Sequence, residues 1–319
     1  MTRLSMQKIF LCVLISFVLC SCDQGGSDTA NRSDGAQKIN ISQNGSLQNP
    51  AWSPDGSRIL FTRFRSRYNK EPADLFIITL ADSSLKTLVS DGSGNINLPG
   101  SSWVGSKIVF SSTREPHDEI YIIDDNGKPS DEVQVTDRKD KVAYEPSLSP
   151  DGQWVVFESH ILDVEGNGVI TKHKVDGTGS YQELTDAGDD CRQPNWSPSG
   201  DVILYQRYSG GQWNIWVMSI DGSNKKQVTS GAGDKTDASF SPDGTWVVYS
   251  SNAGGLDFAN LYIIPTVGGT PVRVTNYNQG YDGAPSWSPD GKTIAFESCE
   301  GDPDWSAGTT LWVIEVPEL

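Results

Sequence analysis

Oxygen-bearing side chains alternate in one short segment that could bind a calcium ion. The segment Asp163-Val-Glu-Gly-Asn-Gly-Val-Ile170 places Asp163, Glu165 and Asn167 at alternate positions, as in the first part of a calcium loop. Lys174 stands where such a loop has the glutamate that closes the site. A glycine-rich hairpin loop explains the same residues without a metal, so calcium is the one cofactor suggested and no cofactor is the main expectation.

Histidine offers a second route to metal chemistry. His117, His160 and His173 are the only three histidines, and the first two fall on neighbouring repeats, which could suit a transition metal. Isolated surface histidines are the simpler interpretation. The sequence has no Gly-x-Ser-x-Gly, no P-loop and no dinucleotide fingerprint. A non-enzymatic role is therefore favoured, and the question of an enzyme stays open.

Cys22 is the residue with the clearest covalent chemistry. The apolar run Ile9 to Leu19 has 11 residues, whereas a membrane-spanning helix needs about 20. The run is typical of a signal peptide. Its end, Leu19-Cys-Ser-Cys22, resembles the lipobox of bacterial lipoproteins. We predict a signal peptide over residues 1–21 and a lipid on Cys22; the alternative is an ordinary signal cleaved nearby, which leaves a plain thiol.

Residues 22–37 are predicted to join this anchor to the folded part. The stretch Asp23 to Gln37 has no apolar periodicity, and a flexible chain of its 15 residues has a mean reach of about 20 Å. The folded part is therefore expected to stay close to a membrane, which we take to be one of the membranes of a bacterial cell envelope.

Composition narrows the partners and the fold class. The 319 residues include 25 Lys and Arg against 41 Asp and Glu, so the formal net charge is −16. Nucleic acid is not expected as a partner, because its phosphates require a basic surface. The 32 Gly and 17 Pro favour turns, and 10 residues each of Trp, Tyr and Phe favour strands. An all-β fold is predicted.

Six copies of one unit occupy most of the chain. Five copies place Ser-Pro-Asp-Gly or Ser-Pro-Ser-Gly directly after a bulky residue, and the second copy, Ser101-Ser-Trp-Val-Gly105, has lost two residues of this turn. Repeats of about 40–50 residues are typical of four-stranded propeller blades. The bulky position falls at Trp52, Trp103, Leu148, Trp196, Phe240 and Trp287.

Each copy predicts four strands, named a to d in chain order. The Ser-Pro-Asp-Gly turn joins strands a and b, a long loop joins b and c, and a tight turn joins c and d. Strand b of each copy contains an aromatic residue, and strand c contains a matching one in every copy except the third. The predicted c strands are 75–80, 119–124, 169–175, 214–220, 260–266 and 310–316.

The sixth copy has no strand d after strand c. At the other end, Lys38-Ile-Asn-Ile-Ser42 has the pattern of a strand d with no blade before it. Pairing this strand with the sixth copy would close the ring and remove exposed sheet edges. We predict one domain over residues 38–319, an all-β, six-bladed β-propeller with four-stranded blades, closed by an N-terminal strand that completes the last blade.

The repeat resembles the WD-like propeller repeat of the TolB family, the periplasmic component of the Tol-Pal system, through its bulky residue, Ser-Pro-Asp-Gly turn and aromatic at fixed spacing. The resemblance implies a propeller in the bacterial envelope. TolB proteins have a separate amino-terminal α/β domain, for which residues 23–37 leave no room, and are soluble rather than lipid-anchored. The resemblance therefore supports a TolB-like chain.

Function is expected where the copies differ, because features common to all copies serve the architecture. The d-to-a and b-to-c loops share one face of the ring, the variable face, and the tight turns share the opposite one, the turn face. Arg, Tyr and Trp concentrate binding energy at protein interfaces. The candidate partner-binding residues are Arg63, Arg114, Arg192, Arg207, Tyr208, Tyr281 and Trp305. A solvated surface is the alternative for each.

These patterns predict a monomeric, non-enzymatic, lipid-anchored propeller, periplasmic or surface-exposed, that binds an envelope protein or peptide and contacts the membrane through its lipid only. The alternative is a carbohydrate-active or metal-dependent enzyme in the propeller channel, because oligogalacturonate lyases share this repeat and use a histidine-bound metal.

The two cysteines of the folded part are predicted to stay unpaired. Cys191 precedes strand a of the fourth copy and Cys299 follows strand b of the sixth. An oxidising compartment permits a disulfide, but its Cα atoms must lie within about 7 Å. One whole blade is expected between the two residues, so free thiols are favoured.

Overall fold

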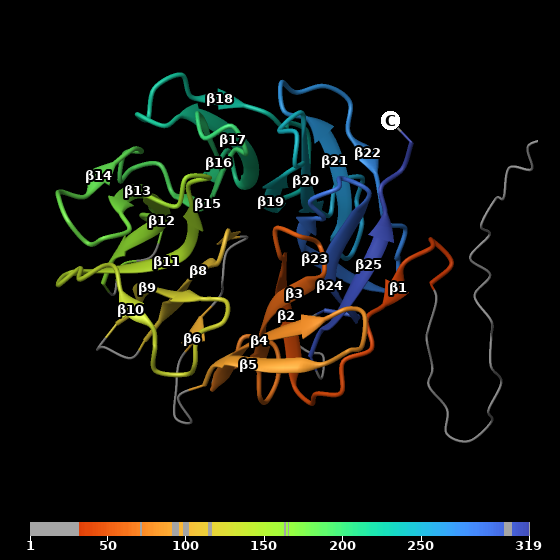
Figure 1. The fold of residues 1–319 in the computed structure, drawn as a ribbon. Coiled ribbons are helices and arrows are strands. Elements are labelled where there is room, and N and C mark those ends of the chain that lie inside the picture. Colours follow the sequence, from red (N-terminus) through yellow and green to blue (C-terminus); the bar gives the residue numbers. More distant parts are fainter. Residues whose placement is uncertain are drawn as a thin grey trace, which may run out of the picture.

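Six antiparallel β-sheets form a ring around a central axis (Figure 1). The computed structural model describes residues 32–70, 72–90, 96–97, 102–113, 117–162, 164, 166–302 and 308–318. The prediction of an all-β, six-bladed propeller is confirmed. Within these residues no helix is long and apolar enough to cross a membrane.

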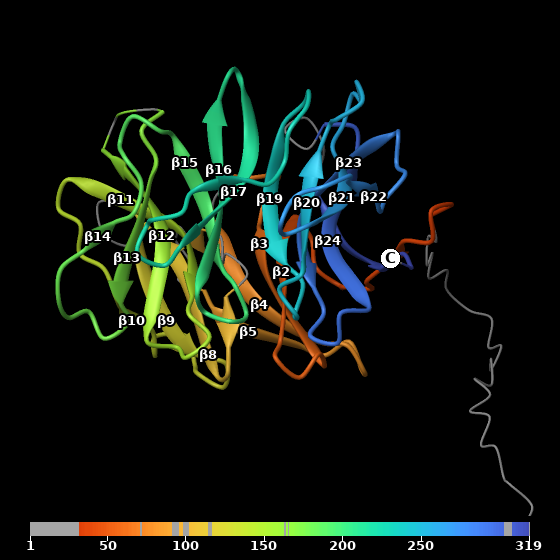
Figure 2. The ribbon, with the colours of Figure 1, turned by 90° about the horizontal axis from the view of Figure 1, so that it is seen from above.

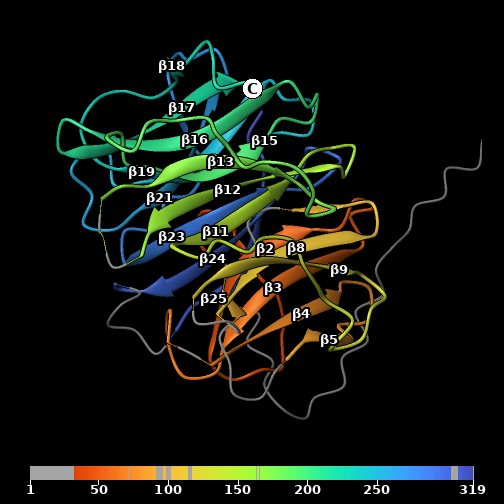
Figure 3. The same ribbon diagram turned by 90° about the vertical axis from the view of Figure 1, so that its left-hand side faces the viewer.

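The strands follow the predicted order in every blade. The first three blades contain β2 (Ser46–Trp52), β3 (Arg58–Phe64), β4 (Ala73–Thr79) and β5 (Leu85–Val89); β6 (Ile96–Asn97), β7 (Trp103–Val104), β8 (Lys107–Ser112), β9 (Glu119–Asp124) and β10 (Val133–Gln134); and β11 (Lys141–Leu148), β12 (Trp154–Ile161), β13 (Val169–Lys174) and β14 (Gln182–Glu183). In the second blade β6 and β7 both pair with β8, so its strand a consists of two pieces. The second and third blades stand side by side in Figure 3.

The other three blades complete the ring. They contain β15 (Cys191–Trp196), β16 (Val202–Ser209), β17 (Gln212–Ser219) and β18 (Lys226–Gln227); β19 (Lys235–Phe240), β20 (Trp246–Ser251), β21 (Asn260–Pro265) and β22 (Val272–Arg273); and β23 (Gly280–Trp287), β24 (Thr293–Glu300), β25 (Thr310–Glu315) and β1 (Gln37–Lys38). Figure 2 shows the ring from its edge, with the β16–β17 hairpin projecting at the top, on the variable face.

The recurring aromatic residues pair strands b and c. Phe61 stands opposite Phe76 in the register, and their rings stack with centroids 5.7 Å apart. Such contacts between facing residues stabilise a sheet and fill the space between blades. The equivalent pairs are Phe110–Tyr121, Phe157–Thr171, Tyr205–Trp216, Tyr249–Tyr262 and Phe296–Trp312.

The Ser-Pro-Asp-Gly turn is closed by its own side chains. In the first blade Ser53 Oγ donates to Asp55 Oδ1 at 2.6 Å and accepts from the backbone N–H of Arg58 at 2.9 Å. Gly56 has φ 71°, which a residue without a side chain adopts at little cost. These bonds are local, which explains why the turn can be identified from the sequence.

An N-terminal strand closes the ring as predicted, but it spans Gln37–Lys38 rather than residues 38–42. Gln37 and Lys38 pair with Val313 and Trp312 of β25, and Ile39 N donates to Leu311 O at 2.9 Å. The sixth blade therefore has the order β1-β25-β24-β23. Because the last blade combines both ends of the chain, the ring cannot open without breaking this sheet.

The packed part begins before residue 38. Arg32, placed in the tether by the sequence, donates through Nη1 and Nη2 to both carboxylate oxygens of Asp282, at 2.6 and 2.8 Å. Its guanidinium lies 4.1 Å from the centre of the Tyr277 ring, and Ala36 is fully buried. Residues 32–36 thus contact the sixth blade, because Arg32 neutralises a carboxylate that is buried there. Residues 1–31, with the predicted signal peptide and Cys22, lie outside the described residues.

Candidate functional site

The a strands are the innermost strands. Residues of all six, including the six bulky positions, line a central cavity of about 350 Å³ at the turn-face end of the axis. The bulky residues therefore border the channel as well as separating the blades, which the sequence interpretation did not anticipate.

A bulge interrupts strand a in five blades, three residues before the bulky position. The register shifts there, and the residue at the bulge has a positive φ of 45–53°. A bulge re-aims side chains and frees a backbone N–H from the ladder. The bulge residues differ between blades: Asn49, Glu145, Gln193, Asp237 and Ala284.

Side chains from neighbouring blades accept hydrogen bonds from three of these N–H groups, those of Asn49, Gln193 and Asp237. Asn49 N donates to Glu297 Oε2, and Gln193 N donates to Glu158 Oε2, each at 2.9 Å. Glu158 and Glu297 both directly follow the aromatic residue of strand b. This position is polar and buried in all six blades, at Thr62, Ser111, Glu158, Gln206, Ser250 and Glu297. A polar residue follows each repeated aromatic in the sequence, and this pattern could have identified the position. The predicted site residues do not include it.

Gln193 joins three blades at the channel. Its Nε2 donates to Asp237 Oδ1 at 2.8 Å and to Glu145 Oε1 at 3.2 Å, and its Oε1 accepts from the backbone N–H of Asp237 at 2.9 Å. Glu145 Oε2 is buried without a hydrogen-bond partner among the described residues. This carboxylate oxygen therefore has no donor inside the described propeller.

The channel carboxyl groups resist ionisation. Burial raises the pKa of Glu145 well above its usual value, and the nearby Glu158 and Asp237 carboxyl groups raise it further. Burial also raises the pKa of Asp237, and it raises that of Glu297 to about 8. None of these three groups forms an ion pair with the described part of the chain. An added positive charge would stabilise their ionised forms.

Two tyrosines cover this group of carboxyls. Tyr68, from the b-to-c loop of the first blade, meets Tyr281 edge to face with ring centroids 6.3 Å apart. Its hydroxyl also hydrogen-bonds to Glu297. Burial raises the pKa of both tyrosines well above the usual value. Tyr281, a predicted site residue, thus lies at the channel, and its partner Tyr68 was not in the predicted set.

The three predicted arginines that the structure describes already have acidic partners within the propeller. Arg192 pairs with Asp190 at 3.0 Å, and Arg207 pairs with Asp189. Arg63 lies 3.6 Å from Asp74 and also donates to a backbone carbonyl. Because these guanidinium groups are engaged, they offer less to an acidic partner than the sequence suggested.

The remaining predicted residues are spread over the variable face. Tyr208 is 48% exposed near the tip of the β16–β17 hairpin and packs on Trp213, with ring centroids 5.3 Å apart. Arg192, Arg207 and Tyr208 share the fourth blade, whereas Arg63 belongs to the first. Arg114 and Trp305 lie outside the described residues.

Asn167 has a structural role in its hairpin. Its Oδ1 accepts from Ile161 N at 3.0 Å and its Nδ2 donates to Val164 O at 2.9 Å, which closes the b-to-c loop of the third blade. Asp163 and Glu165 lie outside the described residues, so calcium binding stays an alternative to the plain hairpin loop.

The three histidines make separate contacts. His117 Nε2 lies 2.7 Å from Arg138 O, His160 Nε2 lies 3.0 Å from Glu158 Oε1, and His173 stacks on Tyr181. In the part of the chain that the structure describes, no three His, Cys, Asp or Glu residues are grouped to hold a metal ion.

No disulfide joins Cys191 and Cys299, as predicted, and both side chains are buried. Burial raises the pKa of Cys191 to about 12. A thiol that stays protonated at neutral pH is a poor nucleophile, so Cys191 is a packing residue.

The family described as the TolB beta propeller domain matches residues 15–258 and 207–304. The chain belongs to this family. The Tol-Pal system protein TolB of Francisella tularensis subsp. holarctica (strain OSU18) is 31% identical over 177 residues, which is 55% of this chain and 39% of the relative. The chain thus matches well under half the length of that relative.

Solved structures agree on the fold. A putative TolB from Agrobacterium tumefaciens superposes with a TM-score of 0.61 at 20% identity, covering 85% of this chain and 91% of that one. An oligogalacturonate lyase in complex with manganese superposes with a TM-score of 0.59 at 15% identity, covering 90% of this chain and 95% of that one. At such identities these TolB-family and lyase structures support the propeller fold alone.

Proposed function

We propose that this TolB-family propeller is a lipid-anchored scaffold of the bacterial cell envelope that binds a protein or peptide at the channel mouth on its variable face and catalyses no reaction. Its relatives carry the name of the Tol-Pal system, and Leu19 to Cys22 supports a lipid anchor. Both points rest on sequence likeness, whereas binding at the channel mouth rests on the side chains found there.

The observation that carries the proposal is the group formed by Glu145, Asp237 and Glu297. These carboxyls have raised pKa values and form no ion pair with the described residues, although the Arg192 guanidinium partly lowers the pKa of Glu145. Arg192 and Arg207 of the same face are already paired with aspartates. A partner that places a basic side chain beside Glu145 would supply the missing donor. Charge-assisted hydrogen bonds of this kind are stronger than neutral ones. The proposed partner therefore presents a basic residue, flanked by groups that pack on the exposed Tyr208 ring.

Site-specific photocrosslinking in intact cells tests this assignment. A photoreactive residue replaces Tyr208 on the variable face or, as the control, Val267, which is 75% exposed after β21 on the turn face. We expect a discrete crosslinked protein from position 208 and none from position 267. Glu145→Lys should weaken the crosslink at least tenfold. Crosslinks of equal yield from both positions would contradict binding on the variable face.

A further inference from the structure

The turns of neighbouring blades contact one another around most of the turn face. A Cβ atom placed on Gly56 would lie 3.2 Å from the ring of Pro289, the turn proline of the preceding blade. The same contact of proline and glycine joins Pro150 to Gly200, Pro198 to Gly244 and Pro242 to Gly291. The repeated turn therefore closes the wedge between adjacent blades as well as reversing the chain.

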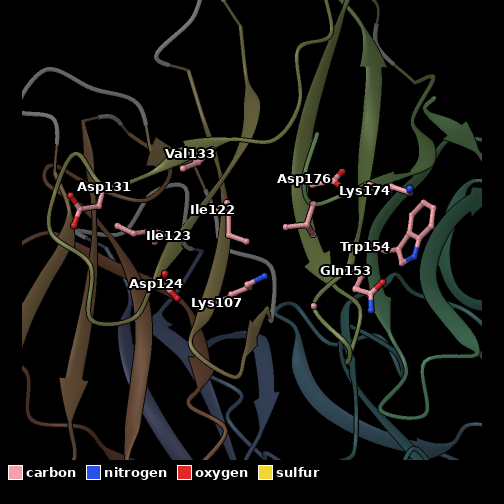
Figure 4. A pocket seen from close by; sticks show the side chains of 12 residues that line it. Lys107, Ile122, Ile123, Asp124, Asp131, Val133, Gln153, Trp154, Lys174 and Asp176 are labelled. Carbon is pink, nitrogen blue, oxygen red and sulfur yellow. The ribbon is translucent and has the colours of Figure 1, made fainter. Parts of the chain in front are cut away.

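Both junctions of the second blade lack this contact, and a Cβ added to Gly105 would meet nothing within 4 Å among the described residues. The second turn has lost the proline and the aspartate, so Gly152 of the third blade faces only the side chain of Lys107, whose Cδ would lie 3.8 Å from an added Cβ. A pocket of about 680 Å³ opens there (Figure 4). Cavities of this size hold small organic ligands.

The two walls of this inter-blade pocket offer similar groups. Lys107, Ile122 and Asp124 come from the second blade, and Lys174, Val175 and Asp176 come from the third. Val133, which is 62% exposed, extends the apolar surface at one side. In Figure 4, Ile122 and Lys107 lie across the gap from Gln153 and Asp176. Each wall therefore presents an ammonium group, a carboxylate and an aliphatic side chain.

The charged groups keep capacity for a ligand. Asp124 Oδ1 accepts from Ser106 at 2.7 Å and Asp176 Oδ1 accepts from Thr178, but no hydrogen bond from the described residues reaches the Oδ2 atom of either. Neither the Lys107 nor the Lys174 ammonium forms an ion pair with that part of the chain. The pocket can thus pair with both signs of charge.

Other ligand classes fit this lining less well. Trp154 is the one aromatic residue of the lining, and the ammonium groups of Lys172 and Lys174 lie over its ring at 5.2 and 5.9 Å. A sugar or base therefore has little open ring face on which to stack. Asp124, Asp131 and Asp176 outnumber the two lysines of the lining and repel a polyanion.

We propose that the inter-blade pocket binds a short zwitterionic peptide with aliphatic side chains. Its ammonium group pairs with Asp124 or Asp176, its carboxylate pairs with Lys107 or Lys174, and its side chains cover Ile122, Val133 and Val175. The site lies on the turn face, so it does not depend on partner binding at the variable face.

Titration calorimetry of the mature chain with trivaline, a tripeptide with both termini free, tests the proposal. We expect saturable one-to-one binding that is lost when trivaline is acetylated and amidated. Lys107→Gln should weaken binding at least fivefold, whereas Lys292→Gln, an exposed lysine in the turn of the sixth blade, should not change it. Inorganic phosphate and maltotriose are the comparison ligands.

A second variant removes the pocket by rebuilding the turn. Inserting Pro-Asp between Val104 and Gly105 restores the repeated turn and should abolish trivaline binding. If the insertion impairs folding, Val133→Asp tests the same pocket, because Val133 is exposed and its replacement leaves the core intact. This variant should also weaken trivaline binding. Absence of saturable binding at millimolar trivaline would overturn the proposal, as would equal binding of capped trivaline, or tighter binding of maltotriose or phosphate.

Discussion

Arg32 binds both carboxylate oxygens of Asp282, a residue 250 positions later whose side chain is completely buried. The contact attaches the segment before β1 to strand a of the last blade. Burial raises the pKa of Asp282, whereas Arg32 lowers it, and burial is the larger influence. Asp282 therefore needs Arg32 in order to be buried as an anion at low cost.

Loss of Arg32 should destabilise the propeller. Arg32→Ala leaves Asp282 buried without its cation, which costs about 3–5 kcal/mol in comparable cases. Thermal melts should show a clearly lower midpoint for this variant and a smaller change for the double variant with Asp282→Asn.

Truncations locate the same boundary. A chain starting at residue 32 should melt like one starting at residue 23, whereas a chain starting at residue 44 lacks β1 and should melt lower and aggregate through the exposed edge of β25. Equal midpoints for all three chains would refute ring closure by the N-terminal strand.

Stability should fall with rising pH because of Glu297. The pKa of an unfolded glutamate is about 4.3, and burial raises that of Glu297 to about 8 in the folded chain. Between these values the folded chain holds a proton that the unfolded chain has lost, so the free energy of unfolding decreases as pH rises. Glu297→Gln should flatten this dependence and stabilise the protein at pH 9 by roughly 3–5 kcal/mol.

Urea unfolding between pH 5 and pH 9 measures this effect. Glu300→Gln is the matched control, because Glu300 lies three residues later on β24 and is exposed. An unchanged slope in Glu297→Gln would show that the carboxyl ionises normally in the folded chain.

Charge reversal of Arg207 should lower stability as well as alter the variable face. Arg207→Asp breaks the pair with Asp189 and removes the guanidinium from the Trp216 ring, whose centre is 5.0 Å away. Both groups are about one quarter exposed, so the expected loss is roughly 1–2 kcal/mol. The double variant Arg207→Asp with Asp189→Arg should recover part of the lost thermal midpoint. If its destabilisation equals the sum of those of the two single variants, the residues do not pair.

The two propeller thiols should react only after unfolding. A Cys22→Ala chain that lacks the signal peptide carries no lipid. Its remaining cysteines are Cys191 and Cys299, which are both buried. Thiol titration at pH 8 should count two thiols in denaturant without reductant, and little or no reaction of Cys191 in the native protein because its pKa is about 12. A count of zero in denaturant would indicate a disulfide.

Membrane attachment should depend on Cys22. Cys22→Ala is expected to appear in the soluble fraction of lysed cells, while the parent chain sediments with membranes. Full membrane association of the variant would contradict the anchor.

The sequence alone determined the blades and their order. The Ser-Pro-Asp-Gly turns and the aromatics at fixed spacing act over a few residues, as Ser53 and Asp55 show, so their pattern predicts structure without knowledge of distant contacts. It also predicted the closing strand, although the packed segment extends further, to Arg32.

Only the tertiary structure decided which residues meet. Asp282 is the partner of Arg32 because the ring joins both ends of the chain, and Glu145 meets Asp237 through Gln193 because three blades converge on one axis. The arginines looked available in the sequence, but folding brought Arg63, Arg192 and Arg207 each beside an aspartate. Likewise, two residues missing from one turn became a pocket only because the next blade stands against the gap. Burial and pairing depend on contacts between blades, which a repeat pattern does not contain.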